Sequence, residues 1–421
     1  MIKKFSSRKN KFCRICLSKI LTTYLNLGNQ PPSNSFINKN EIKKEQFFSL
    51  KVQLCSNCGL SQLDTTVEAS DIFNNYVYLS SSSKALINHY SKMVGRILKK
   101  IKPKKKSLIV DIGSNDGITL KRYPKNHFTL LGIEPSSASK YAKGNGINNE
   151  KKFFDYNFSK IIKKKYGLAK IVTATNVFAH VDKIRNFTRG ISNILESNGV
   201  FVVEFPYIKN MLSDNYFDLI YHEHLCYFSV NPLNKLFIDF GLKIFDIETF
   251  EASASGPGLR LYVCLSKSNK FKINKIVKSY LNKERKMKLN KISTYKKFGK
   301  KINYIKKNIE KILFKLKQKN YALGAFGAPA KGNTMLNFLN NSNNLIEAVA
   351  DNTVEKIGKL TPGTHIPIIN DDNFMKKNIK YCLLLSWNYL DFFIKNSEFI
   401  KKGGKFIVPF PKPRIVPNEK N

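Results

Sequence analysis

The 421-residue sequence has no long apolar run. Because no stretch of about 18 uninterrupted apolar residues occurs, we expect no membrane-spanning helix and no membrane partner. Residues 1–11 have no apolar core of the kind found in a signal peptide, so the expected location is the cytoplasm. At roughly 100–200 residues per domain, the length predicts two or three domains, each able to bury its own core.

Acidic residues are also scarce: 30 Asp and Glu stand against 72 Lys and Arg, for a formal net charge of +42. Such an excess is typical of proteins that bind nucleic acids or anionic surfaces. Here the lysines are spread along the chain among many Ile, Asn and Phe residues, as AT-rich codons would produce, and no basic motif with interleaved aromatics occurs. The sequence therefore disfavours a nucleic-acid partner, while the charge is compatible with an anionic substrate.

Two familiar site patterns are absent as well. Gly113 and Gly117 are spaced G-x-x-x-G, whereas a dinucleotide pyrophosphate requires G-x-G-x-x-G. His222, Glu223 and His224 are consecutive, so they lack the H-E-x-x-H spacing of a metal-binding helix. These absences argue against NAD at the first glycine turn and exclude a zinc-protease helix.

The stretch 108–120, LIVDIGSNDGITL, predicts a strand, a glycine turn and a helix. Aliphatic residues end at Asp111, small polar residues surround Gly113 and Gly117, and helix-compatible sequence resumes at Ile118. In an open α/β sheet, such a turn lies at the carboxyl end of a strand, where backbone amides can face a ligand. The stretch therefore indicates a nucleotide-like cofactor.

The next strand ends in Glu134, close to the roughly 20-residue spacing at which an acidic side chain reaches ribose hydroxyls. A glycine turn followed by such an acid, without a pyrophosphate fingerprint, predicts S-adenosylmethionine in preference to NAD. Two upstream tyrosines can stack on the ligand or pack in the core. The predicted cofactor-binding residues are Gly113, Asn115, Gly117, Glu134, Tyr76 and Tyr78.

Seven cysteines are present, and four of them form two C-x-x-C pairs, Cys13 with Cys16 and Cys55 with Cys58. Without a secretion signal, doubled pairs indicate metal binding before disulfides. Four thiolates complete a tetrahedral shell with no open position, which predicts structural rather than catalytic zinc. The alternative is two unrelated pairs that stay reduced.

The strand pattern continues with AKIVTATN and GVFVVEFP, separated by a helical segment at 181–195. Asn176 and His180 follow the fourth strand, where they are expected to line the methyl-donor side of the cofactor, although His180 can also be a cap or core residue. Two further strands, LKIFDIETF and GLRLYVC, predict an antiparallel edge for this sheet.

The densest group of titratable residues is YHEHLCYF, at 221–228. Its histidines, carboxylate and phenol are the groups that general acid–base chemistry needs near neutral pH. On an extended segment, His222 and His224 would point one way and Tyr221 and Glu223 the other. The alternative is a polar loop that only forms hydrogen bonds.

Downstream, apolar residues at helical spacing between 298 and 316 predict a long helix whose lysines face solvent. From 321, YALGAFGAPAKGNT predicts a second strand, glycine turn and helix, followed by the strands of a small parallel sheet. Pro329 and Lys331 occupy the place where a pyrophosphate-binding helix should begin. We expect a Rossmann-like scaffold that holds the substrate, with Lys331 in contact with phosphate.

Taken together, the sequence resembles the three-domain S-adenosylmethionine-dependent sugar C-methyltransferases, which act on nucleotide-linked 4-keto-6-deoxy sugars. The resemblance covers nearly the whole chain and rests on the cysteine unit and the motifs LGNQPPSNSF, DIGSNDG, IEPS, NVFAH, YHEHLCYFS, GAFGAPAKGNT and VADNT. It implies an α/β protein with a zinc-binding domain at 1–65, a class I methyltransferase Rossmann-like domain at 66–265, and a helical connector with a Rossmann-like substrate domain at 266–421.

The resemblance also implies a mechanism. The ketone acidifies the neighbouring C–H, so a base can form an enolate whose carbon attacks the cofactor's methyl group. His224 matches the family's candidate base, with Tyr221 as a competing base or as a donor to the enolate oxygen. Glu223 is the implied orienting residue.

Other implied contacts surround this group. Asn176 and His180 match active-site positions near the cofactor, and either Tyr76 or Tyr78 matches an aromatic donor. The nucleotide-linked sugar is expected between the central and C-terminal domains, in a basic groove. The substrate contacts so assigned are Lys331, Arg260 and His222.

Three other functions stay open at this point. The enzyme can instead methylate an oxygen or nitrogen of another small molecule, the protein can be a zinc-containing nucleic-acid binder, or it can be a scaffold without catalysis. For the oligomeric state we expect a monomer or a weak dimer.

Overall fold

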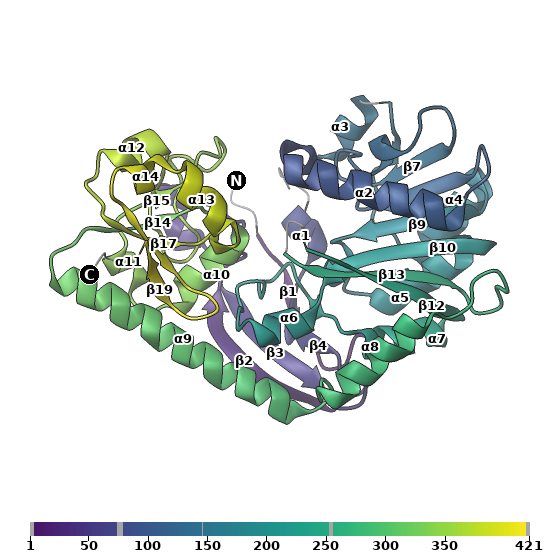
Figure 1. Ribbon diagram of the computed structural model, residues 1–421, viewed down its shortest axis with the longest axis horizontal. Helices are drawn as coiled ribbons and strands as arrows, with labels where there is room; N and C mark the ends of the chain where they lie inside the picture. Colours follow the sequence, from purple (N-terminus) through teal and green to yellow (C-terminus); the bar gives the residue numbers. More distant parts are fainter. Residues whose placement is uncertain (1–3, 74–78, 145, 252–255, 418–421) are drawn as a thin grey trace.

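Three large β-sheets and one two-stranded ladder, with their flanking helices, build the described part of the protein (Figure 1). The computed structural model describes residues 4–73, 79–144, 146–251 and 256–417. A large central unit and a smaller C-terminal unit lie on opposite sides of the view, with the N-terminal sheet below and between them. Within the described residues, no helix has the length and apolar character needed to cross a membrane. The predicted fold class is confirmed.

The N-terminal sheet has four antiparallel strands in the order β11-β4-β3-β2, beside a two-stranded ladder of β1 with β5. Its edge strand β11 comes from the central part of the chain, directly after the Tyr221–His224 group. The strands are β1 (Ser7–Lys9), β2 (Leu21–Gln30), β3 (Phe48–Cys55), β4 (Ser61–Leu63), β5 (Thr65–Val67) and β11 (Cys226–Tyr227), with a 3-10 helix η1 (Lys39–Lys44) before β3.

The central sheet has seven strands in the order β12-β13-β10-β9-β6-β7-β8. Five are parallel, and β13 runs antiparallel to both β10 and β12, as the sequence predicted for this edge. The strand order reverses between β6 and β9, the place where open α/β sheets bind ligands. The strands are β6 (Leu108–Ile112), β7 (Thr129–Ile133), β8 (Asn148–Glu150), β9 (Ala169–Thr175), β10 (Leu195–Pro206), β12 (Leu242–Phe250) and β13 (Gly258–Leu265).

Helices cover both faces of the central sheet, because successive apolar residues of its buried strands point to opposite sides. Ile109 of β6 packs with α2 and α3, whereas Val110 packs on the side of α4, α5 and α7. The remaining helices before the connector are α1 (Ala69–Phe73), α2 (Lys84–Ile101), α3 (Ser139–Gly144), α4 (Tyr156–Tyr166), α5 (Ile184–Ile194), α6 (Ile208–Ser213), α7 (Val230–Asp239) and α8 (Lys275–Lys286), with 3-10 helices η2 (Ser80–Ser82), η3 (Leu120–Arg122) and η4 (Phe178–His180).

The prediction of an α-helix after the Gly113–Gly117 turn is wrong. In this described stretch the chain forms turns and then only the 3-10 helix η3 before β7 begins. Just six residues separate Gly117 from Pro124, too few for a stable α-helix before the proline ends it. The helix that packs beside the turn is α2, which precedes β6 in the chain.

The C-terminal sheet has six strands in the order β16-β15-β14-β17-β18-β19, parallel except for the antiparallel edge strand β19. The predicted small parallel sheet is therefore present. Its elements are β14 (Leu323–Phe326), α10 (Ala330–Phe338), α11 (Ser342–Leu345), β15 (Val349–Ala350), β16 (Ile368–Ile369), α12 (Asp371–Met375), β17 (Tyr381–Leu384), η5 (Trp387–Tyr389), α13 (Leu390–Asn396), α14 (Glu398–Lys401), β18 (Lys405–Val408) and β19 (Arg414–Val416).

The long helix α9 (Ile292–Gln318) leads from the central to the C-terminal unit and crosses β2 on the way (Figure 1). One cluster of buried apolar side chains continues through all three sheets, so the units share a core. The predicted division at 1–65, 66–265 and 266–421 stays a prediction.

Gly299 sets the approach of α9 to β2, because a Cβ atom at this position would lie 2.5 Å from the Tyr24 carbonyl oxygen. We predict that Gly299→Ala lowers the free energy of unfolding by about 1–3 kcal/mol, although alanine favours helix formation. The matched control is Gly95→Ala in α2, where nothing lies within 4 Å. It should stabilise by roughly 0.5–1 kcal/mol. Urea unfolding of both variants measures this, and equal effects would contradict the packing argument.

Candidate active site

A cavity of about 1350 Å³ opens at the carboxyl ends of the central strands β6, β7 and β9. Its lining comes from all three units of the chain. The volume exceeds the roughly 300–1,000 Å³ of a typical small-molecule pocket, so it has room for two ligands. Among the lining residues are Asn34, Gly113, Glu134, Asn176, Glu223 and Lys331.

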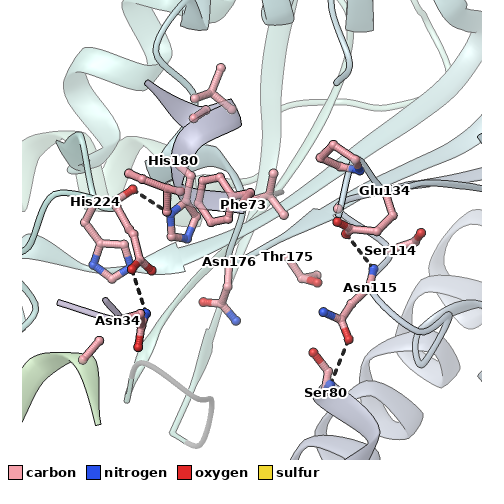
Figure 2. Close-up of a pocket in the computed structure, with 18 of the residues that line it drawn as sticks. Asn34, Phe73, Ser80, Ser114, Asn115, Glu134, Thr175, Asn176, His180 and His224 are labelled. Carbon is pink, nitrogen blue, oxygen red and sulfur yellow. Dashed lines mark hydrogen bonds between the residues drawn. The ribbon is translucent and has the colours of Figure 1, made fainter. Parts of the chain in front are cut away.

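The glycine turn forms one side of the cavity. Gly113 has a φ of +70°, and a Cβ atom there would lie 2.2 Å from Val177 Cγ2, so only glycine fits. The Asn115 N–H donates to Glu134 Oε2 at 2.9 Å (Figure 2), and the Ser136 N–H donates to Oε1 of the same carboxylate at 2.9 Å. Each oxygen keeps a further lone pair, which suits an acceptor of ribose hydroxyl groups.

The segment before α2 covers this turn, which the sequence did not predict. The Ser80 N–H donates to Asn115 Oδ1 at 2.9 Å, and the Ser81 N–H donates to Asp116 Oδ2 at 3.2 Å. Tyr76 and Tyr78, the two aromatic residues predicted to contact the cofactor, lie outside the described residues.

Asn176 lies between the glycine turn and the histidines in the view of Figure 2. It adopts a left-handed backbone conformation with φ +55°, and its N–H donates to the Glu204 carbonyl at 3.1 Å. Its side-chain oxygen is buried and accepts no hydrogen bond from the described residues. A buried orphan oxygen fits a ligand that brings a donor or a positive charge, as S-adenosylmethionine does.

His180 lines the cavity. Its Nδ1 lies 2.6 Å from the Glu223 carbonyl oxygen, which can only accept, so Nδ1 holds the proton and donates (Figure 2). Burial lowers the pKa of His180 to about 4, so the ring stays neutral at pH 7. The rings of His180 and His224 lie 4.8 Å apart.

His224 is held in one tautomer. Its Nδ1–H donates to the Leu219 carbonyl at 2.8 Å, which leaves a lone pair on Nε2, and the Tyr221 hydroxyl lies 3.0 Å from that nitrogen. Burial, and to a lesser extent His180, lowers the pKa of His224 to about 3. The ring is therefore neutral near pH 7, and Nε2 is a proton acceptor.

Glu223 lines the same cavity and is 3 % exposed. Burial raises its pKa to about 7, although Asn34 Nδ2 donates to its Oε1 at 2.7 Å. Asn34 comes from the N-terminal unit, and no local sequence pattern predicts its contact with Glu223. Such a carboxyl group exchanges protons near neutral pH.

The predicted alternation of the YHEH segment is wrong, because residues 221–223 form a bend and turn and strand β11 begins only at Cys226. Tyr221 and His224 therefore share one side, joined by the hydrogen bond between them. His222 points away toward the N-terminal sheet, where Nε2 lies 3.3 Å from the Phe48 carbonyl oxygen. It lies outside the cavity lining, so we no longer assign it to the substrate.

Arg260 also has a different place from the one assigned to it. It lies on β13 and is 2 % exposed. Its guanidinium pairs with Glu204 at 2.5 Å and with Glu248 at 2.7 Å, so its donors are occupied inside the protein. Its single positive charge is thus paired with the buried Glu204 and the half-buried Glu248, and we no longer assign Arg260 to a phosphate.

Lys331, by contrast, lines the cavity at the start of α10. Two further lysines of the C-terminal unit, Lys356 and Lys359, line the same side and were missed, because they belong to a loop without a motif. Lys356 pairs with Asp351 at 3.4 Å. Cationic side chains gathered on one wall suit an anionic group such as a phosphate.

The four paired cysteines meet away from this cavity, with all four Sγ atoms within 4.8 Å of one another. The Cys13–Cys58 and Cys16–Cys55 sulfur atoms are each 3.5 Å apart. Four sulfurs around a zinc ion at about 2.3 Å would be roughly 3.8 Å apart, so the cluster fits tetrahedral zinc. Its closed shell makes the metal structural.

Family models match three consecutive parts of the chain. They describe a zinc-binding domain at residues 13–73, a methyltransferase domain at 85–247 and a C-methyltransferase C-terminal domain at 253–411. C-methyltransferase NovU of Streptomyces niveus is 29 % identical over 410 residues, which are 97 % of each chain. Together these findings show an S-adenosylmethionine-dependent methyltransferase that is similar to C-methyltransferases. S-adenosylmethionine and structural zinc are accordingly its cofactors.

Solved methyltransferase structures match part of the chain at low sequence identity. An S-adenosylmethionine-dependent enzyme of Clostridium acetobutylicum is 12 % identical with a TM-score of 0.34, over 42 % of this chain and 92 % of the other. Magnesium protoporphyrin IX methyltransferase of Synechocystis, with bound S-adenosylmethionine, is 11 % identical with a TM-score of 0.31, over 42 % of this chain and 81 % of the other.

The raised pKa of Glu223 makes stability depend on pH. Since the folded protein binds this proton more tightly than the unfolded chain, stability falls as pH rises from about 4.5 to about 7. We predict that Glu223→Gln stabilises the protein at pH 8 by up to about 3 kcal/mol, and by less than about 1 kcal/mol at pH 5. Urea unfolding at both pH values measures this. The exposed carboxyl variant Glu251→Gln should change neither value, and a Glu223→Gln protein that is less stable at pH 8 would contradict the argument.

Proposed function

We propose that the protein methylates the carbon next to the ketone of a nucleotide-linked 4-keto-deoxy sugar, through an enolate. The observation that carries this proposal is the Tyr221–His224 pair, in which a neutral imidazole presents a lone pair at the cavity. Transfer to an oxygen or an amine needs no C–H cleavage, whereas transfer to carbon does. The similarity to a C-methyltransferase supports the same choice.

The proton has two routes to His224. In the first, Nε2 of His224 takes the proton from the sugar carbon directly, and Tyr221 turns to donate to the enolate oxygen. In the second, the Tyr221 hydroxyl passes its proton to Nε2 and takes the proton of the sugar carbon. Both routes break the C–H bond, place its electron pair on the enolate and leave a positive charge on His224.

Charge balance explains how an imidazole of such low pKa can act here. The enolate is anionic, so the imidazolium forms next to a new negative charge and is stabilised by it in the buried site. Glu223, with its pKa near 7, can return the proton to solvent after turnover. When bound, S-adenosylmethionine supplies the electrophilic methyl group to which the enolate carbon forms its new bond.

The substrate's nucleotide is assigned to the C-terminal side of the cavity. Lys331, Lys356 and Lys359 lie there, and two phosphates bring the negative charge that they can neutralise. Asn176, Asn115 and Glu134 lie on the cofactor side. The same proposal includes a cytoplasmic location, action as a monomer or weak dimer, and no nucleic-acid partner.

His224→Asn separates proton transfer from binding. The asparagine amide can still donate to the Leu219 carbonyl, as Nδ1–H does, but it lacks the Nε2 lone pair. We predict that turnover and the exchange of solvent deuterium into the carbon next to the ketone both fall by at least about 10²-fold, with unchanged affinity for S-adenosylmethionine by calorimetry. Full deuterium exchange in this variant would place the base elsewhere.

Two further variants complete this experiment. Tyr221→Phe should keep deuterium exchange if the proton moves directly to His224, and should lose it if the tyrosine relays the proton. The matched control is His222→Gln, because the glutamine amide can replace Nε2 as donor to the Phe48 carbonyl. Turnover in this control should stay within about threefold of wild type.

A further inference from the structure

Residues 216–220 of the central unit contact the C-terminal unit. Phe217 is fully buried and packs against Phe338 and Phe410, with ring centroids 4.9 and 5.7 Å apart. The Tyr216 ring lies 5.6 Å from the ring of Trp387. The contact is therefore made of large apolar side chains around one polar group.

That polar group is Asp218, which is 1 % exposed. Trp387 Nε1–H donates to its Oδ2 at 2.6 Å, from the 3-10 helix that follows β17. Its Oδ1 is buried and accepts no hydrogen bond within the described part of the chain. Burial raises the pKa of Asp218, while the nearby charge of Lys331 and the Trp387 donor both lower it again. A carboxylate here depends on partners from the C-terminal unit.

Asp218 is also the residue directly before Leu219, whose carbonyl holds His224 Nδ1–H at 2.8 Å. The short turn between them is closed by two backbone bonds, Ile220 N–H to the Phe217 carbonyl at 2.8 Å and His224 N–H to the Tyr221 carbonyl at 2.9 Å. A shift of Asp218 therefore moves the carbonyl that fixes the tautomer of His224.

In the C-terminal unit, Trp387 lies next to a residue that lines the cavity. Lys331 lines the cavity, its Nζ lies 5.2 Å from the centroid of the Trp387 ring, and it hydrogen-bonds Asn388 in the same 3-10 helix. An anion bound to Lys331 would therefore lie beside Trp387, whose Nε1–H donates to Asp218.

We propose that Asp218 is a positioning residue, which through Trp387 makes the orientation of His224 depend on the seating of the C-terminal unit. This inference rests on the proposed function for the role of His224, and it adds a residue outside the cavity lining. Through Trp387 and Asp218, it connects Lys331 on the cavity wall to His224 by a series of direct contacts.

The first test needs no substrate. Amide hydrogen exchange of the full-length zinc-bound protein should be about 10-fold faster at Ile220 and His224 in Asp218→Ala and in Trp387→Phe than in wild type. Asp218→Asn keeps an acceptor for Trp387 Nε1–H and should restore slow exchange to within about twofold. The matched control is Tyr216→Phe, because the Tyr216 hydroxyl is buried and has no hydrogen-bond partner among the described residues. Unchanged exchange in both Asp218→Ala and Trp387→Phe would overturn the proposal.

The second test uses turnover of a nucleotide-linked 4-keto-6-deoxy sugar. Asp218→Ala and Trp387→Phe should each lower kcat by about 10-fold with unchanged affinity for S-adenosylmethionine, and Asp218→Asn should recover most of the rate. Because both changes remove one hydrogen bond, the double variant should also lose only about 10-fold, and an additive loss of about 100-fold would contradict the proposal. If wild type itself does not methylate the sugar, the proposed function fails, while hydrogen exchange still decides the role of Asp218.

Discussion

The hydrogen bond from His224 Nδ1 to the Leu219 carbonyl decides which nitrogen of the buried imidazole can accept a proton. Without it, a neutral ring could place its hydrogen on either nitrogen, and the lone pair would not face Tyr221 reliably. The bond spans a short turn, so its geometry depends on how residues 216–225 are held. The tautomer of His224 therefore depends on how all three units of the chain are arranged around this segment.

Each of the three units holds that segment at a different point. The N-terminal sheet binds its end, since Leu63 N–H donates to the Leu225 carbonyl at 3.0 Å and Asn34 donates to Glu223. The central unit holds the middle through His180 and the Glu223 carbonyl. The C-terminal unit holds the start through Trp387 and Asp218. The four cysteines join the segment before β2 to the β3–β4 turn of the N-terminal sheet, and their closed shell provides no open metal position.

Sequence patterns predicted those parts of the site that are formed by residues close together in the chain. The Gly113–Gly117 turn, the acid Glu134 at the end of the next strand, and the two C-x-x-C pairs each depend on residues close in sequence, and each is found in the expected surroundings. The fold class followed from the same alternation of strands and helices. Contacts across about 190 residues, such as Asn34 with Glu223, have no such signature. The orientation of His222 was missed because a turn forms in place of the expected strand. The place of Arg260 was missed because its guanidinium pairs with Glu204 and Glu248, which are distant in sequence.

The position of the transferred methyl group tests the central claim most directly. The protein would be incubated with S-adenosylmethionine carrying a ¹³C-labelled methyl group and with a nucleotide-linked 4-keto-6-deoxy sugar, and the product would be examined by NMR. Methylation through an enolate predicts a labelled methyl carbon with one-bond coupling to the ring carbon next to the ketone. A label bound to oxygen or nitrogen, or no transfer to the sugar, would contradict the account.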